Sequence, residues 1–205
     1  MKALIIVDVQ NDFIPGGTLA VPGGDEVVPV INDLQACFPL VVATQDWHPA
    51  DHMSFASNHR GRAPFEQIRV DGLDQVLWPD HCVQGTGGAD FHGDLDLRQV
   101  EAIIRKGTDP RIDTYSGFYD NAHRKSTGLA GYLRERGVRQ VFLCGLAADI
   151  CVYFTARDAL REPFETCFIE DATRALDRGD FEKAKSDIRA KGGRIIQAAD
   201  VLQSS

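Results

Sequence analysis

The chain has 205 residues, enough to form one substantial hydrophobic core, and no stretch is biased enough in composition to mark a linker between two domains. Hydrophobic residues make up 43% of the chain and charged residues 25%, values that exclude a disordered or fibrous protein. The net charge of -8 argues against a nucleic acid as partner, because binding a polyanion requires a basic surface.

Short runs of aliphatic and β-branched residues predict buried strands, each followed by a polar or glycine-containing turn. Longer segments with helical spacing lie between them, the first with Asp25 as its candidate N-cap. This alternation predicts an α/β fold with a parallel sheet covered by helices on both faces. The predicted strands are residues 3–10, 38–46, 101–107, 140–146, 165–172 and 194–201, and the predicted helices are residues 25–38, 126–137, 150–162 and 180–193.

The segment from about residue 50 to residue 96 interrupts this alternation. It is rich in histidine, proline, glycine and aromatic residues and has little periodicity. A loop of this length in a compact domain is usually functional. Ligands of open α/β sheets bind beyond the carboxyl ends of the strands, which directs attention to Asp8, Asp46, Lys106 and the turn at 145–151.

The amino terminus and the cysteines both indicate a cytoplasmic protein. The first apolar run, "ALIIV", is too short for the core of a signal peptide or for a membrane span, so we expect no membrane partner. The five cysteines form an odd set without a C-x-x-C pair, which argues against a disulfide framework.

Cys151 follows a predicted strand and lies in the first turn of a predicted helix, with Asp149 placed to cap that helix. The positive end of the helix dipole would favour the thiolate, and free backbone N–H groups in the same turn could bind an oxyanion. These features make Cys151 a candidate nucleophile. The alternative is a small buried hydrophobic side chain.

Asp8 and Lys106 each end a predicted strand, and both could converge on Cys151 if their strands are neighbours. The lysine charge would favour the thiolate, while the carboxylate would take the thiol proton and later deliver it to a leaving amine. The alternative is a structural ion pair beside the sheet.

In "DWH" an extended backbone sends Asp46 and His48 to one side and Trp47 to the other, so the pair could share one cation. Carboxylate and imidazole together suit zinc, iron or manganese. Further ligands have to come from elsewhere, and spacing alone does not choose among the candidates, which are His52, His59, His81 and His92.

Several motifs together closely resemble the nicotinamidases (pyrazinamidases) of the isochorismatase-like cysteine hydrolase family. They occur in the family's order, from the first strand to beyond Cys151. The motifs are "IIVDVQNDF" with "GGTLAVPGGD", then "TQDWHPADHMSF", "WPDHCVQGT", "IRKGTDPRIDTYSGF" and "GLAADICV".

The resemblance implies a Rossmann-like, three-layer α/β/α fold with a parallel sheet of about six strands. Residues 1–205 would form one domain, with a metal-binding loop region near 46–96. The implied reaction is hydrolysis of nicotinamide to nicotinate and ammonia through a cysteine thioester, in NAD salvage, with pyrazinamide also accepted. The implied partner is this small substrate alone, with the chain a monomer or a homo-oligomer.

The resemblance carries the family's catalytic triad onto Asp8, Lys106 and Cys151. It also implies a non-proline cis peptide bond between Leu146 and Ala147, which would aim the amides of Ala147 and Cys151 at the oxyanion.

For the metal, the resemblance implies Asp46, His48 and His81 as ligands, with zinc the first choice and iron or manganese the alternatives. The spacing of His52 differs from that of the further ligand that some members recruit, so we place His52 outside the ligand set. The positions that match the family's nicotinamide pocket are Phe13, Leu19, Trp78, Tyr115 and Leu146. Aromatic residues at such positions otherwise serve the core.

Two rival functions stay open. One is another hydrolase of the same superfamily, acting on isochorismate or on an N-carbamoyl compound. The other is a metal-binding or thiol-redox module without turnover. Ammonia release from nicotinamide would separate the second rival from the amidohydrolase, and a metal assay with a substrate panel would separate the first.

Overall fold

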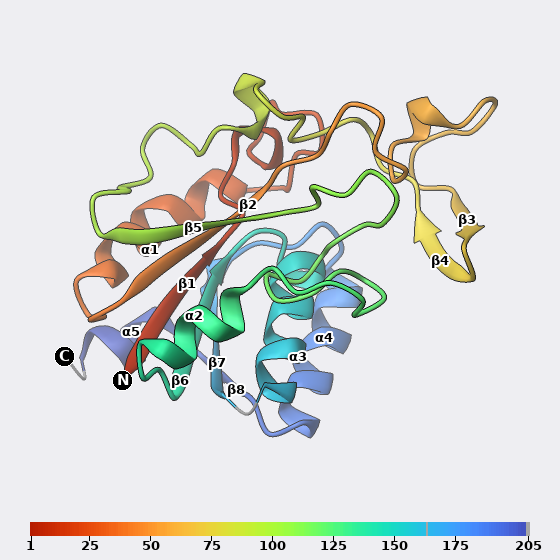
Figure 1. The fold of residues 1–205 in the computed structure, drawn as a ribbon. Helices are drawn as coiled ribbons and strands as arrows, with labels where there is room; N and C mark the ends of the chain where they lie inside the picture. Colours follow the sequence, from red (N-terminus) through yellow and green to blue (C-terminus); the bar gives the residue numbers. More distant parts are fainter. Residues whose placement is uncertain (163, 204–205) are drawn as a thin grey trace.

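The computed structural model describes residues 1–162 and 164–203 and confirms the predicted α/β fold (Figure 1). Within these residues, six parallel strands form the central sheet in the order β5-β2-β1-β6-β7-β8. Their bounds are β1 Lys2–Val7, β2 Val41–Asp46, β5 Val100–Lys106, β6 Gln140–Gly145, β7 Glu165–Thr173 and β8 Arg194–Ile196.

The order of the strands in the sheet reverses between β1 and β6. From β1 it adds β2 and β5 on one side, and from β6 it adds β7 and β8 on the other. Ligands of open α/β sheets bind at such a switch point, outside the carboxyl ends of the strands. Asp8 follows β1 directly and the turn that carries Cys151 follows β6, so both residues belong to this crevice.

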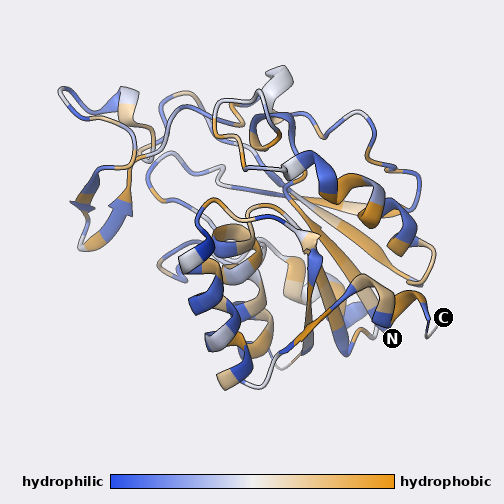
Figure 2. Ribbon diagram, turned by 180° about the vertical axis from the view of Figure 1, so that it is seen from behind, coloured by the Kyte–Doolittle hydropathy of each residue, from blue (hydrophilic) through white to orange (hydrophobic). Residues whose placement is uncertain are grey.

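Helices cover both faces of the sheet, because successive side chains of a strand point to opposite faces. On one face, α1 (Val27–Gln35) and α5 (Ala198–Leu202) pack against a set of strand residues that includes Ile6. On the other, α2 (Leu129–Glu135), α3 (Tyr153–Arg161) and α4 (Arg178–Ala190) pack against a set that includes Ile5. The strands at the centre are accordingly apolar and the outer faces of the helices are polar (Figure 2).

Two predicted details at element ends are wrong. Asp25 lies inside a short 3-10 helix, Gly24–Glu26, and Glu26 occupies the N-cap of α1 without a side-chain bond. The strand predicted over 194–201 ends at Ile196, because a capping box starts α5: the Gln197 N–H donates to the Asp200 carboxylate at 2.8 Å.

The irregular segment between β2 and β5 contains a hairpin that the sequence analysis missed. Strands β3 (Gln67–Val70) and β4 (Leu73–Val76) pair antiparallel and project from the body (Figure 1). Asp71 and Gly72 join them with φ values of 50° and 81°. An Asp-Gly pair is typical of a two-residue hairpin turn, so the sequence did contain an indication of this hairpin.

The rest of this segment lies across the carboxyl end of the sheet. His48 forms a β-bridge with Val83, and Phe55 forms one with Trp78. These bridges bring Trp78 and His81 to the end of β2.

Within the described part of the chain, no helix combines the length and the apolar character needed to cross a membrane.

Candidate active site

Asp8, Lys106 and Cys151 meet at the carboxyl ends of β1, β5 and β6. The Lys106 ammonium (Nζ) lies 2.9 Å from Asp8 Oδ2 and 3.5 Å from Cys151 Sγ. Asp8 is fully buried, and Lys106 and Cys151 are 2% and 7% exposed. The structure therefore brings together the three residues that the sequence indicated as a triad.

The hydrogen bonds of Lys106 leave one oxygen of Asp8 available. Its ammonium has three protons, and it donates to Asp46 Oδ1 at 2.7 Å, to the Thr114 carbonyl at 3.0 Å and to Cys151 Sγ at 3.5 Å. Asp8 Oδ1 accepts from the Thr44 hydroxyl at 2.6 Å. Asp8 Oδ2 forms an ion pair with the Lys106 ammonium at 2.9 Å but no hydrogen bond of regular geometry among the described residues, so it can still accept the thiol proton.

Burial and charge set the protonation states of the triad. Burial raises the pKa of the Cys151 thiol well above its usual value. The charge of Lys106 lowers this pKa, and the Asp8 and Asp46 carboxylates raise it. Burial also raises the pKa of Asp8. Burial would lower the pKa of Lys106, but the two carboxylates hold it well above its usual value. In this environment the pKa shift of Cys151 favours the thiol, opposite to the effect expected from the helix dipole.

Cys151 lies in a single π-helical turn, Ala148–Val152, that precedes α3. The predicted capping role of Asp149 is wrong, since its carboxylate accepts instead from the Leu176 and Asp177 N–H groups, at 3.0 and 2.8 Å. The turn itself, not a side-chain cap, presents the thiol.

The peptide bond between Leu146 and Ala147 is cis, as the resemblance implied. The Ala147 carbonyl accepts from the Ile150 and Val152 N–H groups, at 3.1 Å each. The Ala147 N–H has no acceptor among the described residues, and Ala147 lines the cavity beside Cys151. A backbone donor of this kind is available to an oxyanion.

Asp46, His48 and His81 offer three buried donor atoms to one point. Asp46 Oδ2 lies 3.3 Å from His48 Nε2 and 3.6 Å from His81 Nε2, and the three donor atoms lie within 4.8 Å of one another. The other ring nitrogens are held by backbone carbonyls, His48 Nδ1 by Gly107 at 3.0 Å and His81 Nδ1 by Pro79 at 2.8 Å. A carbonyl behind each imidazole fixes the tautomer that leaves Nε2 free to ligate. These residues fit a divalent metal ion.

His52 lies next to this donor set, and one of its nitrogens forms a second group with His48 and Asp113, whose donor atoms lie within 4.8 Å of one another. Its Nδ1 is 2.7 Å from the Ser54 hydroxyl and its Nε2 is 3.3 Å from the Ile112 carbonyl. Burial and the neighbouring His48 lower the pKa of His52 to about 4. His52 is therefore a neutral side chain, and its ring packs against the rings of His48 and Phe55.

The other two candidate ligands lie outside the donor set. His59 Nε2 is 2.7 Å from the Met53 carbonyl, and His92 Nδ1 accepts from the Asp94 N–H at 3.3 Å.

A small cavity of about 20 Å³ borders both the thiol and the metal donors. Four of the predicted pocket residues line it, namely Phe13, Leu19, Trp78 and Tyr115, together with Asp46, His81, Ala147 and Cys151. Leu146 does not contribute to the lining, because its side chain is fully buried in the core. Asp113, Ile150 and Leu176 also line the cavity, and the sequence analysis missed them.

Gln10 is a further residue of the site that the sequence analysis missed. Its fully buried side-chain amide accepts from the Asp46 N–H at 2.8 Å and donates to the Asp46 carbonyl at 2.8 Å. The same nitrogen donates to the Ala89 carbonyl at 2.9 Å. The signal was present, since Gln10 lies two residues after Asp8, at the polar end of an apolar strand.

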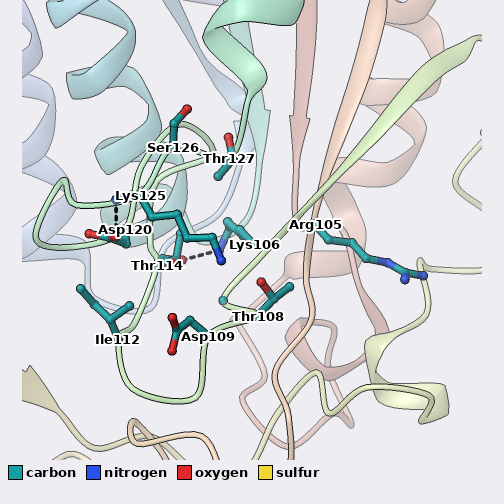
Figure 3. A pocket seen from close by; sticks show the side chains of 11 residues that line it. Arg105, Lys106, Thr108, Asp109, Ile112, Thr114, Asp120, Lys125, Ser126 and Thr127 are labelled. Carbon is teal, nitrogen blue, oxygen red and sulfur yellow. Dashed lines mark hydrogen bonds between the residues drawn. The ribbon is translucent and has the colours of Figure 1, made fainter.

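A second cavity, of about 160 Å³, is lined by residues of the segment 112–115 and by Lys106 (Figure 3). Ile112 and Thr114 face it, whereas Asp113 and Tyr115 face the cavity with the thiol. The Lys106 ammonium reaches the Thr114 carbonyl from this side (Figure 3). Residues 112–115 therefore lie between the second cavity and the cavity that contains the thiol.

Comparisons with known proteins agree with this geometry. Residues 2–200 match the model of the isochorismatase domain. A nicotinamidase of Acinetobacter baylyi is 49% identical over 201 residues, which cover 98% of this chain and 94% of that protein. A solved nicotinamidase and pyrazinamidase of Acinetobacter baumanii has a TM-score of 0.95 at 50% identity, covering 98% of this chain and 97% of that one. The solved pyrazinamidase of Pyrococcus horikoshii in complex with zinc has a TM-score of 0.79 at 40% identity, covering 96% and 98%.

Proposed function

The chain belongs to the isochorismatase family, and from this premise we propose that it is a metal-containing cysteine amidohydrolase that converts nicotinamide to nicotinate and ammonia. One observation carries the proposal. A buried thiol, with a carboxylate oxygen able to take its proton, shares one small cavity with three donor atoms arranged for a metal. Residues 1–205 act as one catalytic domain.

Attack on the carboxamide begins from a protonated thiol. As Cys151 Sγ bonds to the carbonyl carbon, its proton passes to Asp8 Oδ2, the oxygen without a hydrogen bond of regular geometry among the described residues. The charge that develops on the carbonyl oxygen is held by the amides of Ala147 and Cys151. The Lys106 ammonium lies 2.9 Å from Asp8 Oδ2 and 3.5 Å from Sγ, so it holds the carboxylate and the sulfur in place during the proton transfer.

Collapse of the tetrahedral intermediate returns the proton. Asp8 delivers it to the amide nitrogen, the carbon–nitrogen bond breaks and ammonia leaves, so that the acyl group remains on Cys151 as a thioester. A water molecule, deprotonated by Asp8, then attacks the thioester, and its proton returns to the sulfur. One water is consumed and the free acid is released.

The apolar part of the cavity receives the ring. Phe13, Leu19, Trp78 and Tyr115 supply the faces of a pocket for a flat heterocycle. Asp46, His48 and His81 would hold the metal, for which we propose zinc, with iron or manganese as alternatives. When bound, the metal would supply a Lewis acid for a ring-nitrogen lone pair.

Ammonia release from a panel of compounds tests this function. We expect nicotinamide and pyrazinamide to release ammonia, and Cys151→Ser to lose nearly all of this activity while keeping its fold by circular dichroism. Preferred turnover of an N-carbamoyl compound or of isochorismate would favour the related hydrolases instead. A folded, metal-loaded wild-type protein that released no ammonia would indicate the non-enzymatic module.

A further inference from the structure

Leu176, in the loop between β7 and α4, separates two open spaces. It lines the cavity that contains Cys151, and it also lines a groove of about 920 Å³. The groove continues along β7 and α4, where its lining includes Glu170, Phe181 and Lys185. Leu176 is half-buried, as expected for a side chain that borders two open spaces.

The loop is attached to the turn that carries the nucleophile. Asp149 Oδ1 accepts from the Leu176 N–H at 3.0 Å and Asp149 Oδ2 accepts from the Asp177 N–H at 2.8 Å. In the same turn, the Ala148 N–H donates to the Arg174 carbonyl at 2.7 Å. Three hydrogen bonds therefore fix the position of Leu176 relative to the thiol two residues after Asp149.

Contacts at both ends of the loop keep it from moving independently. At its start, the Arg174 guanidinium forms an ion pair with Glu26, with 2.8 Å between Nη2 and Oε2. At its end, the Asp177 side chain caps α4 by accepting from the Asp180 N–H at 2.8 Å. The position of Leu176 is thus set before any ligand binds.

We propose that Leu176 is a specificity-determining residue that limits the size of the ring the cavity admits, and that Asp149 is the positioning residue that holds it there. This inference rests on the proposed amidohydrolase function and names the part of the cavity that excludes larger amides. Phe13 and Leu19 are buried members of the hydrophobic core, whereas Leu176 packs against that core only in part and also borders the groove. A change at Leu176 would join the cavity to the groove along β7 and α4, which a ring substituent can occupy.

The central experiment measures kcat/KM for nicotinamide and for nicotinamides that carry a methyl or ethyl group at each free ring carbon in turn. Leu176→Ala is expected to raise the ratio of substituted to unsubstituted amide at least tenfold at one ring position. One methylene in an apolar pocket changes discrimination by roughly 10–200-fold. Leu176→Val, which removes less volume, should give a smaller change at the same position and serves if the alanine variant is unstable.

Leu19→Ala is the matched control, since it removes the same atoms from a wall backed by the core. It should lower kcat/KM for nicotinamide without raising the ratio at the position that Leu176→Ala opens. An unchanged ratio in both Leu176 variants, or an equal rise in Leu19→Ala, overturns the inference. A wild-type protein that does not hydrolyse nicotinamide would instead contradict the proposed function, so the two failures are distinct.

Asp149→Asn tests the positioning role, because its NH₂ group cannot accept the second backbone N–H. Because Leu176 is then held less firmly, KM for nicotinamide should rise severalfold more than kcat falls. Adding Leu176→Ala to Asp149→Asn should change the ratio of kcat/KM for substituted and unsubstituted nicotinamide less than Leu176→Ala does in the wild-type protein. A fall in kcat at unchanged KM would show that Asp149 acts on the nucleophile alone and would overturn this part.

Discussion

The Lys106 ammonium lies 2.7 Å from Asp46 Oδ1, while Oδ2 of the same carboxylate faces His48 and His81. One side chain therefore joins the acid–base residues to the metal donors. Burial would raise the pKa of Asp46, but Lys106 and His48 hold it well below its usual value, so the carboxylate stays ionised for both neighbours. A change at Asp46 should alter metal binding and thiol titration together.

The first prediction follows from this shared carboxylate. In protein stripped of metal, Asp46→Asn removes one of the negative charges that raise the pKa of Cys151. The thiol should then lose its proton at lower pH, so the pH profile of Cys151 alkylation should move to lower pH. Iodoacetamide labelling with mass spectrometry would measure this. His81→Ala is the control, because it removes a metal donor but no negative charge, and its profile should match the wild type.

The second prediction concerns the proton acceptor. Asp8→Asn keeps the shape of the side chain but cannot accept the thiol proton, and general acid–base catalysis typically contributes ~10²–10⁴-fold, which sets the expected loss in kcat. The buried Lys106 would still pair with Asp46, so thermal unfolding should shift little. Thr44→Val removes only the bond to Asp8 Oδ1 and should cost far less activity. A variant of Asp8 within a few-fold of the wild type would assign this carboxylate a structural role.

The third prediction concerns Gln10. Gln10→Ala leaves the buried N–H and carbonyl of Asp46 without their partner, and losses of groups behind a metal ligand typically lower metal affinity about 10–100-fold. Competition with a chromogenic chelator would measure the affinity. Gln45→Ala is the matched control, since Gln45 is also buried and also donates to Ala89, but Asp46 forms no hydrogen bond with it. Equal losses in both variants would point to general disruption of the strand end.

The fourth prediction concerns the role of the metal. Benzamide has the same carboxamide and ring shape as nicotinamide but lacks the ring nitrogen. If the metal orients the ring, nicotinamide should be hydrolysed far faster than benzamide, and chelation should remove most of that preference, because holding reacting atoms in near-attack geometry is worth several kcal/mol. The hydrolysis rates of both amides, measured with and without metal, test whether the metal orients the ring. A ratio that chelation leaves unchanged would favour a role in supplying hydroxide for thioester hydrolysis.

The strands and the residues at their ends could be predicted because both depend on local pattern. An apolar run such as "ALIIV" followed by Asp8 indicates a strand and the polar residue at its end, and parallel strands bring such residues to one edge. The family motifs added His81, which no spacing rule selected from among the histidines.

The missed residues depend on contacts between segments far apart in the sequence. Leu176 lies in the cavity only because Asp149, 27 positions earlier, binds its backbone. Asp149 fits the pattern of a helix cap, but the π-helical turn gives its carboxylate a different partner. Asp113 lies in an irregular segment, where no periodicity indicates which residues face inward.

The chain contains two tryptophans, and both lie at the site. Trp47 stands between two metal donors in the sequence, with the Arg105 guanidinium carbon 3.9 Å from the centre of its ring. Trp78 lines the cavity, and its indole N–H donates to the Tyr115 hydroxyl at 3.3 Å. Tryptophan fluorescence of the protein, excited selectively, therefore originates from the neighbourhood of the site. Ring binding should change the emission through Trp78 and metal binding through Trp47, so stopped-flow fluorescence can time both events without an added label.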